Sequence, residues 1–232
     1  MDEKRGNLFK VIIEEYIKSA TPVGSSLIVE KYLPDVSSAT VRNYMAELEA
    51  EALLMQPHTS AGRIPTVAGY EYYLANFIGE GQLSAKSKKI LEEALKSLSI
   101  KDREQIKTLA KLIAELSDAT VLIGFGPMDV YYTGVANLFK QPEFLEQGSV
   151  YSMSAVIDHL DEVMAKIFYQ IEDDVKVLIG DSNPFGSMSS VVVSKCHGLS
   201  NDLLVGILGP SRMDYRSNLG LLNYLKQYFN QK

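Results

Sequence analysis

The first third of the chain alternates short amphipathic segments with turn residues. Apolar residues recur at the three- and four-residue spacing of one buried helical face: Phe9, Ile12, Ile13, Tyr16 and Ile17. Proline and glycine within residues 21–25 end this helix, and a short helix is predicted over residues 25–31. A third helix is predicted to run to about Glu51, with Ser37 as the N-cap that accepts a backbone N–H.

The third predicted helix has two different faces. Its docking face contains Val41, Met45, Leu48 and Ala52, and its opposite face contains Ala39, Thr40, Asn43, Ala46 and Glu47 with Arg42 at the flank. Residues 53–55 and 63–65 are short extended candidates around a turn-rich loop, and residues 69–78 are predicted to form a closing helix. Three helices followed by two brief strands are typical of a winged helix-turn-helix.

The rest of the chain changes from helical to mixed periodicity. Polar and small residues at 79–85 indicate a linker, and amphipathic helices are predicted over residues 86–98 and 102–116. Short β-branched runs bounded by turn residues predict strands at 119–125, 175–179, 188–195 and 203–208, with helices at 151–170 and 215–229. We therefore expect an α+β protein with a DNA-binding domain (1–78), a linker and connecting helix (79–101), and a regulatory or dimerisation domain (102–232).

Composition narrows the classes of protein. Apolar residues make up 46% and charged residues 22% of the chain, and no run approaches the ~20 apolar residues of a membrane span. The single cysteine, Cys196, excludes an internal disulfide framework. With no basic and then apolar leader, these features predict a cytoplasmic protein without a membrane partner.

The net charge of −6 argues against nucleic-acid binding unless the charge is unevenly distributed. Residues 1–76 hold seven Lys and Arg against ten Asp and Glu. However, residues 36–46 contain Arg42 and no acid, and residues 52–70 contain His58 and Arg63 and no acid. The two segments predicted to meet DNA are thus free of acidic residues. So few cations favour a dimer on a two-fold operator.

Several motifs resemble the HrcA repressor family. They are Pro22-Val23-Gly24-Ser25, Ser38-Ala39-Thr40-Val41-Arg42-Asn43-Tyr44-Met45-Ala46-Glu47-Leu48-Glu49 and, most specifically, Gln56-Pro57-His58-Thr59-Ser60-Ala61-Gly62-Arg63-Ile64-Pro65-Thr66. Shorter similarities follow at 132–137, 141–144 and 205–215. The resemblance implies an N-terminal winged helix followed by a GAF-like α+β domain.

The resemblance also implies a function and partners. Members of this family repress heat-shock chaperone operons by binding an inverted-repeat operator in double-stranded DNA, and a GroEL-type chaperonin maintains their activity. A homodimer is implied as well. Three departures stand out. Ser38 replaces a common proline, and Tyr44 replaces a common acid. The interval that usually contains extra strands and an inserted dimerisation domain is reduced to Gly126-Pro127-Met128-Asp129.

The candidate DNA-binding residues come from the third helix and the loop. On the helix we select Ser38, Thr40, Arg42 and Asn43, because Asn pairs bidentately with adenine and Arg with guanine or phosphate. In the loop we select His58, Thr59, Ser60 and Arg63. The competing interpretation is an ordinary surface helix and a structural hairpin, with Gly62 making the turn and Arg63 bracing the loop.

Enzymatic alternatives have little support in the sequence, and we expect no catalytic residues, metal or cofactor. Gly124-Phe125-Gly126 lacks the third glycine of a dinucleotide loop. Residues 158–162 resemble a solvated helical face more than a metal cluster, and Cys196-His197 is an isolated pair. A different alternative stays open, namely a metabolite-responsive winged-helix regulator whose GAF-like domain binds a small ligand.

Overall fold

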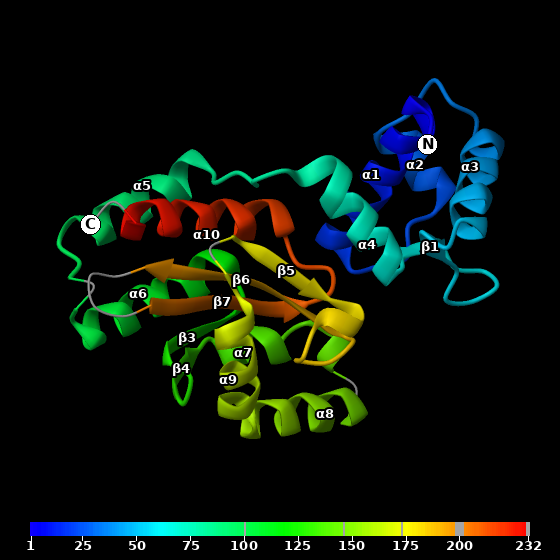
Figure 1. Cartoon of the computed structure of the whole chain (residues 1–232). Helices are drawn as coiled ribbons and strands as arrows, with labels where there is room; N and C mark the ends of the chain where they lie inside the picture. Colours follow the sequence, from blue (N-terminus) through cyan, green and yellow to red (C-terminus); the bar gives the residue numbers. More distant parts are fainter. Residues whose placement is uncertain (100, 146, 173, 198–201, 231–232) are drawn as a thin grey trace. The chain divides into compact units, whose positions relative to one another are not determined.

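The computed structural model describes residues 1–232 except 100, 146, 173, 198–201, 231 and 232 (Figure 1). The chain divides into two compact units, Met1–Gly79 and Glu80–Lys232. Within the described residues, none of the helices has the length and apolar character needed to span a membrane.

The first unit consists of helices and one small sheet. In chain order its elements are α1 (Glu3–Ser19), α2 (Ser25–Lys31), α3 (Ser38–Ala50), β1 (Leu54–Met55), β2 (Ile64–Pro65), α4 (Val67–Tyr73) and the π-helix η1 (Leu74–Ile78). Strands β1 and β2 pair antiparallel. The helical periodicity predicted for α1 is confirmed, because Phe9, Ile12 and Ile13 are fully buried.

Helix α3 begins and ends as the sequence predicts, with Ala50 as its last residue and Glu51 as its C-cap. Ser37 is its N-cap, and the Ser37 hydroxyl accepts a hydrogen bond from the Thr40 backbone N–H at 3.1 Å. Val41, Met45 and Leu48 are buried as predicted. Placing Ala52 on the same docking face was wrong. Ala52 is exposed beyond the helix end with φ 57°, and its carbonyl accepts a hydrogen bond from the Thr66 hydroxyl at 2.6 Å.

A buried carboxylate ties α1 to the end of α2. The side chain of Glu15 accepts hydrogen bonds from the Tyr32 hydroxyl and from Lys31 Nζ, the latter at 3.1 Å. These two donors hold the pKa of Glu15 below its ordinary value, although burial opposes the shift. The carboxylate is therefore charged and satisfied at neutral pH, which keeps α2 in register with α1.

The second unit contains a five-stranded antiparallel sheet with the order β4-β3-β7-β6-β5. Its strands are β3 (Thr120–Gly126), β4 (Asp129–Thr133), β5 (Lys176–Ile179), β6 (Ser189–His197) and β7 (Asp202–Pro210). β6 and β7 are buried along most of their length. That burial explains the apolar runs at 191–193 in β6 and at 203–208 in β7.

Helices cover both faces of this sheet (Figure 1). They are α5 (Ala85–Lys96), α6 (Arg103–Ser117), α7 (Val135–Phe139), α8 (Gln147–Asp158), α9 (Leu160–Gln170) and α10 (Tyr215–Asn230), with short 3-10 turns η2 (Pro142–Phe144) and η3 (Gly180–Ser182). A large core joins the face carrying Leu122, Val191 and Leu204 to Leu138 of α7 and Met164 of α9. The predicted α+β class is confirmed.

Two features of this unit differ from the sequence prediction. The single helix predicted at 151–170 is two helices, because the backbone at His159 (φ −110°, ψ 24°) leaves the helical conformation. Strand β4 was not predicted. It pairs with β3 in a hairpin that closes where Gly126 is opposite Asp129. The four residues in which the sequence analysis located the missing insertion therefore form a tight turn.

The family-like motifs of the second unit perform structural roles. Gly134 has φ 79°, and a Cβ there would lie 2.6 Å from the Ala119 carbonyl oxygen. Arg212 Nε donates to Glu143 Oε1 at 2.5 Å, and its Nη2 donates to Gln141 at 2.7 Å. This arginine thereby fixes the segment after α7 to the loop that precedes α10.

Candidate nucleic-acid interface

The N-terminal ends of α2 and α3 meet around one arginine. Arg42 Nε donates to the Ser25 hydroxyl at 3.2 Å, and Arg42 Nη2 donates to the Ser38 hydroxyl at 3.3 Å. The two hydroxyls are 2.9 Å apart. We call this cluster of Ser25, Ser38 and Arg42 the α2–α3 corner. Ser25 and Ser38 are the first residues of their helices, so backbone N–H groups and the positive ends of two helix dipoles face this region.

The surroundings of Arg42 differ from those of the other arginines of the first unit. Arg5 forms ion pairs with Glu47 and Glu51, and Arg63 forms one with Glu49. Among the residues that the structure describes, Arg42 has no carboxylate partner, and its side chain is exposed. Its positive charge is therefore oriented by hydroxyls but not neutralised.

The other helix residues selected from the sequence lie in two settings. Asn43 is exposed next to Arg42, as expected for a residue that meets another molecule. Thr40 is half-buried, and its hydroxyl lies 2.9 Å from that of Ser37. The Thr40 side chain thus belongs to the helix cap, whereas the Asn43 residue is exposed.

The hairpin loop, residues 56–63, is held in shape by its own residues. Gln56 Nε2 donates to the carbonyls of Thr59 and Ala61, each at 2.9 Å. The backbones of Val23 and Arg63 exchange two hydrogen bonds of 2.9 Å. His58, Thr59 and Ser60 are exposed at the tip. The loop therefore presents these three side chains from a fixed backbone.

The expected role of Gly62 was wrong in detail. Gly62 does not have a positive φ, so the turn does not require glycine for its dihedral angles. Instead, a Cβ at this position would lie 2.4 Å from the Val23 carbonyl carbon. Glycine is needed because the loop passes directly against the segment that precedes α2.

Arg63 is directed inward, towards α3. Its Nη2 lies 2.9 Å from Glu49 Oε2, and its side chain is 18% exposed. The Nε of Arg63 is buried without a hydrogen-bond partner among the described residues. This geometry fits the bracing interpretation, in which Arg63 connects the loop to the end of α3.

A groove joins the corner to the loop. It has a volume of about 550 Å³, and its lining includes Gly24, Arg42, Asn43, Gln56 and Ser60. None of the described lining residues is Asp or Glu. The groove thus offers a guanidinium, amides and hydroxyls, which are the groups that hydrogen-bond phosphates and base edges.

Two residues that position this site were not selected from the sequence. Ser25 orients Arg42, and Gln56 shapes the loop. Both belong to segments with family-like motifs, Pro22-Val23-Gly24-Ser25 and the loop motif that starts at Gln56. Those motifs were the available signal, but spacing alone does not reveal that Ser25 contacts a residue 17 positions later.

The other candidate clusters do not assemble into sites. Burial raises the pKa of the Cys196 thiol to about 12, and His197 Nδ1 lies 2.7 Å from Asp202 Oδ1. His159 is exposed, with Nδ1 3.4 Å from Glu162. Across the described residues, no group of three or more His, Cys, Asp or Glu could hold a metal ion.

Comparisons with known proteins give a consistent result. A family model described as "HrcA protein C terminal domain" matches residues 71–218. A heat-inducible transcription repressor HrcA of Carboxydothermus hydrogenoformans is 25% identical over 334 positions, covering 100% of this chain and 98% of the relative. Since this chain has 232 residues, about 100 of those positions have no counterpart here.

Two other relatives with the same description match over shorter segments. The repressor of Natranaerobius thermophilus is 39% identical over 53% of this chain and 36% of its own length. The repressor of Mycoplasmoides gallisepticum is 51% identical over 39% of this chain and 26% of its own length. In these matches the aligned part of the chain covers between about a quarter and about a third of each relative. A solved structure of a hypothetical protein has the same fold, with a TM-score of 0.74 and 18% identity over 100% of this chain and 99% of that chain.

Proposed function

The chain belongs to the HrcA family of transcription repressors, and on this premise we propose that its first unit is a winged helix-turn-helix that binds operator DNA. In this proposal α3 is the recognition helix and the hairpin loop is the wing. The protein represses heat-shock chaperone operons in the cytoplasm and acts through an inverted-repeat operator. The second unit is GAF-like, and a GroEL-type chaperonin maintains the repressor in its active form.

One observation carries the proposal. Arg42 is exposed and oriented by two serine hydroxyls without a carboxylate partner among the described residues. An arginine that braces a fold is ordinarily neutralised, as Arg5 and Arg63 are. An oriented, unneutralised guanidinium at two helix N-termini favours an anion from outside the chain, and DNA supplies such anions in a regular array.

The roles of the selected residues follow from their positions. Arg42, with Ser38 and the adjacent helix N-termini, binds phosphate. Asn43 reads a base edge, because it is exposed and lines the same groove as Arg42. His58, Thr59 and Ser60 contact the backbone of the adjacent groove from the loop tip. Thr40 supports the helix cap, and Arg63 braces the loop.

The proposal is tested by fluorescence anisotropy with a labelled inverted-repeat operator from a chaperone promoter and a scrambled duplex of equal length. We expect the full chain to bind the operator at least ~10³-fold more tightly than the scrambled duplex at physiological salt. Equal affinity for the two duplexes would contradict operator recognition.

A two-fold operator implies a homodimer, because its half-sites lie about one helical turn, ~34 Å, apart. We expect light scattering to give the mass of a dimer at micromolar concentration. The candidate interfaces are the amphipathic helices over residues 86–116 and the surface around residues 131–144. A strictly monomeric chain that bound only half-sites would show that dimerisation is not a property of the free protein.

A further inference from the structure

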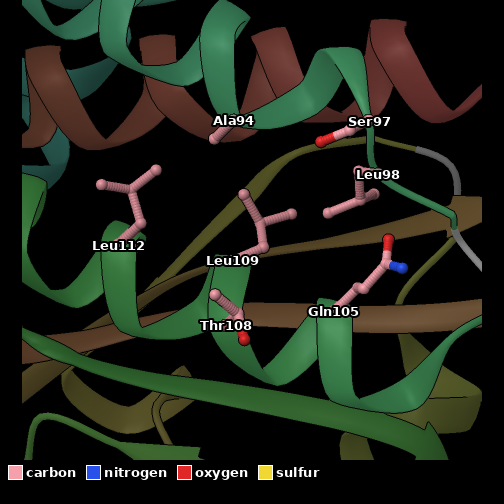
Figure 2. Close-up of a pocket in the computed structure, with 7 residues that line it drawn as sticks. All are labelled: Ala94, Ser97, Leu98, Gln105, Thr108, Leu109 and Leu112. Carbon is pink, nitrogen blue, oxygen red and sulfur yellow. The ribbon is translucent and has the colours of Figure 1, made fainter.

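A cavity in the second unit is not explained by repression or by DNA binding. It lies between α5 and α6, has a volume of about 330 Å³, and is lined by Ala94, Ser97, Leu98, Gln105, Thr108, Leu109 and Leu112. Figure 2 shows α5 on one side and α6 on the other, with Ala94, Leu109 and Leu112 facing the space between them.

The cavity exists because the two helices are attached to different supports. Helix α5 is held to α10 by the Tyr228 hydroxyl, which donates to the Leu95 carbonyl. Helix α6 is held to β4, where Arg103 Nη1 lies 2.5 Å from Asp129 Oδ2 and Lys107 lies over the Tyr131 ring. Ala94 of α5 lies opposite Leu109 and Leu112 of α6. Their facing side chains therefore leave a space.

The buried apolar residues of α5 do not fill that space. Leu91 and Leu95 are buried at 0% and 1% exposure but do not line the cavity. The cavity is lined instead by Leu98 and Leu109, which are 9% and 4% exposed. The leucines that line the cavity are therefore different from Leu91 and Leu95, the buried leucines of α5.

Two of the polar side chains that line the cavity, those of Gln105 and Thr108, are hydrogen-bonded within the chain. The Gln105 side chain accepts from the Ser99 backbone N–H at 2.7 Å and donates to Asp102 at 2.9 Å. The Thr108 hydroxyl donates to the Glu104 carbonyl at 2.9 Å. No charged side chain is among the described residues that line the cavity. A charged ligand would lose its hydration there without gaining an opposite charge.

We propose that this cavity binds an uncharged, mainly apolar small molecule with two or three rings or an aliphatic chain of similar bulk. The volume lies at the lower end of the range for ligand pockets, which are mostly apolar with few polar groups. Leu98, Leu109 and Leu112 supply the apolar contacts. The Gln105 amide and the Thr108 hydroxyl are already hydrogen-bonded within the chain, which disfavours ligands that need several hydrogen bonds.

The test uses N-phenyl-1-naphthylamine, an uncharged dye whose fluorescence rises in apolar surroundings. We expect the full wild-type chain to bind one molecule with a dissociation constant on the order of 10 μM. Ala94→Phe places a ring in the cavity and should weaken binding by roughly tenfold or more. Ala85→Phe is the matched control, because Ala85 is exposed on the same helix but outside the cavity lining.

Two further readouts make the result decisive. Methyl resonances of Leu98, Leu109 and Leu112 should shift when the dye is added, and those of Leu8 and Leu48 in the first unit should not. This NMR experiment uses the wild-type chain, so it tests ligand binding even if Ala94→Phe lowers the stability of the protein. The proposal is overturned by absent wild-type binding, by equal binding of both variants, or by shifts confined to other residues. It is also overturned if the affinity for the dye decreases as the protein concentration rises, because a second copy of the chain would then cover the cavity.

Discussion

The α2–α3 corner and the hairpin loop each contain one arginine, and these two arginines have opposite surroundings. Arg42 is exposed and is oriented by Ser25 and Ser38. Arg63 is mostly buried and paired with Glu49 at 2.9 Å. The sequence assigned both to DNA. An arginine is available to bind phosphate when no carboxylate neutralises it, and its position in an acid-free segment of the sequence does not ensure this.

The largest expected effect comes from disturbing the loop while leaving the corner intact. Gly62→Ala places a Cβ within 2.4 Å of the Val23 backbone, which should lower the free energy of unfolding of the first unit by about 3 kcal/mol. Gly24→Ala is the control, because a Cβ there meets nothing within 4 Å. Urea denaturation followed by circular dichroism measures both. Equal stability of the two variants would show that the loop is free to move away from α2.

Asn43→Ala tests whether the exposed side of α3 reads sequence. Loss of a bidentate base contact should weaken operator binding by about 2 kcal/mol. Binding to random DNA should weaken much less, because it depends on phosphate contacts, which carry no sequence information. Anisotropy titrations with the operator and a scrambled duplex give the two values. An equal loss of affinity for both duplexes would show that Asn43 contacts the DNA backbone and does not read a base.

Arg42→Ala should weaken binding to both duplexes by about 1.5 kcal/mol, since a charge-assisted contact to phosphate is lost whatever the sequence. Arg42→Lys keeps the charge but loses the planar fork that Ser25 and Ser38 hold, so we expect an intermediate loss. The same titrations measure these changes. Unchanged affinity in Arg42→Ala would mean that the corner stays away from DNA.

The smallest expected effect belongs to the Arg63–Glu49 pair. Arg63→Ala and Glu49→Gln should each lower the free energy of unfolding by about 0.5–1 kcal/mol, because the pair is only partly exposed. The double variant should lose less than the sum of the two, since both single changes remove the same pair. Additive losses in chemical denaturation would show that the two side chains act independently.

The sequence predicted most elements correctly where one periodicity dominated. The spacing of Phe9, Ile12 and Ile13 specified α1, and the β-branched run in β6 specified a buried strand. Strand β4 escaped because it is a short edge strand whose residues are half-buried or exposed. The helix break at His159 was not predicted because the amphipathic pattern continues on both sides of it.

The candidate site was predictable as a set of residues but not as an arrangement. Asn43 and Arg42 follow from the pattern of α3, because the opposite face of that helix is apolar. Arg42 is oriented by Ser25, 17 positions away, whereas Arg63 is neutralised by Glu49, 14 positions away. Such contacts depend on how the helices pack, which local periodicity does not encode.

The most direct test of the account is the salt dependence of DNA binding for the wild type, Arg42→Ala and Arg63→Ala in identical buffers. Each phosphate contact contributes about 0.9 to the slope of log K against log salt concentration. We predict that Arg42→Ala lowers the magnitude of the slope by about 0.9 and that Arg63→Ala leaves it at the wild-type value. A lowered slope in Arg63→Ala together with an unchanged slope in Arg42→Ala would contradict the account.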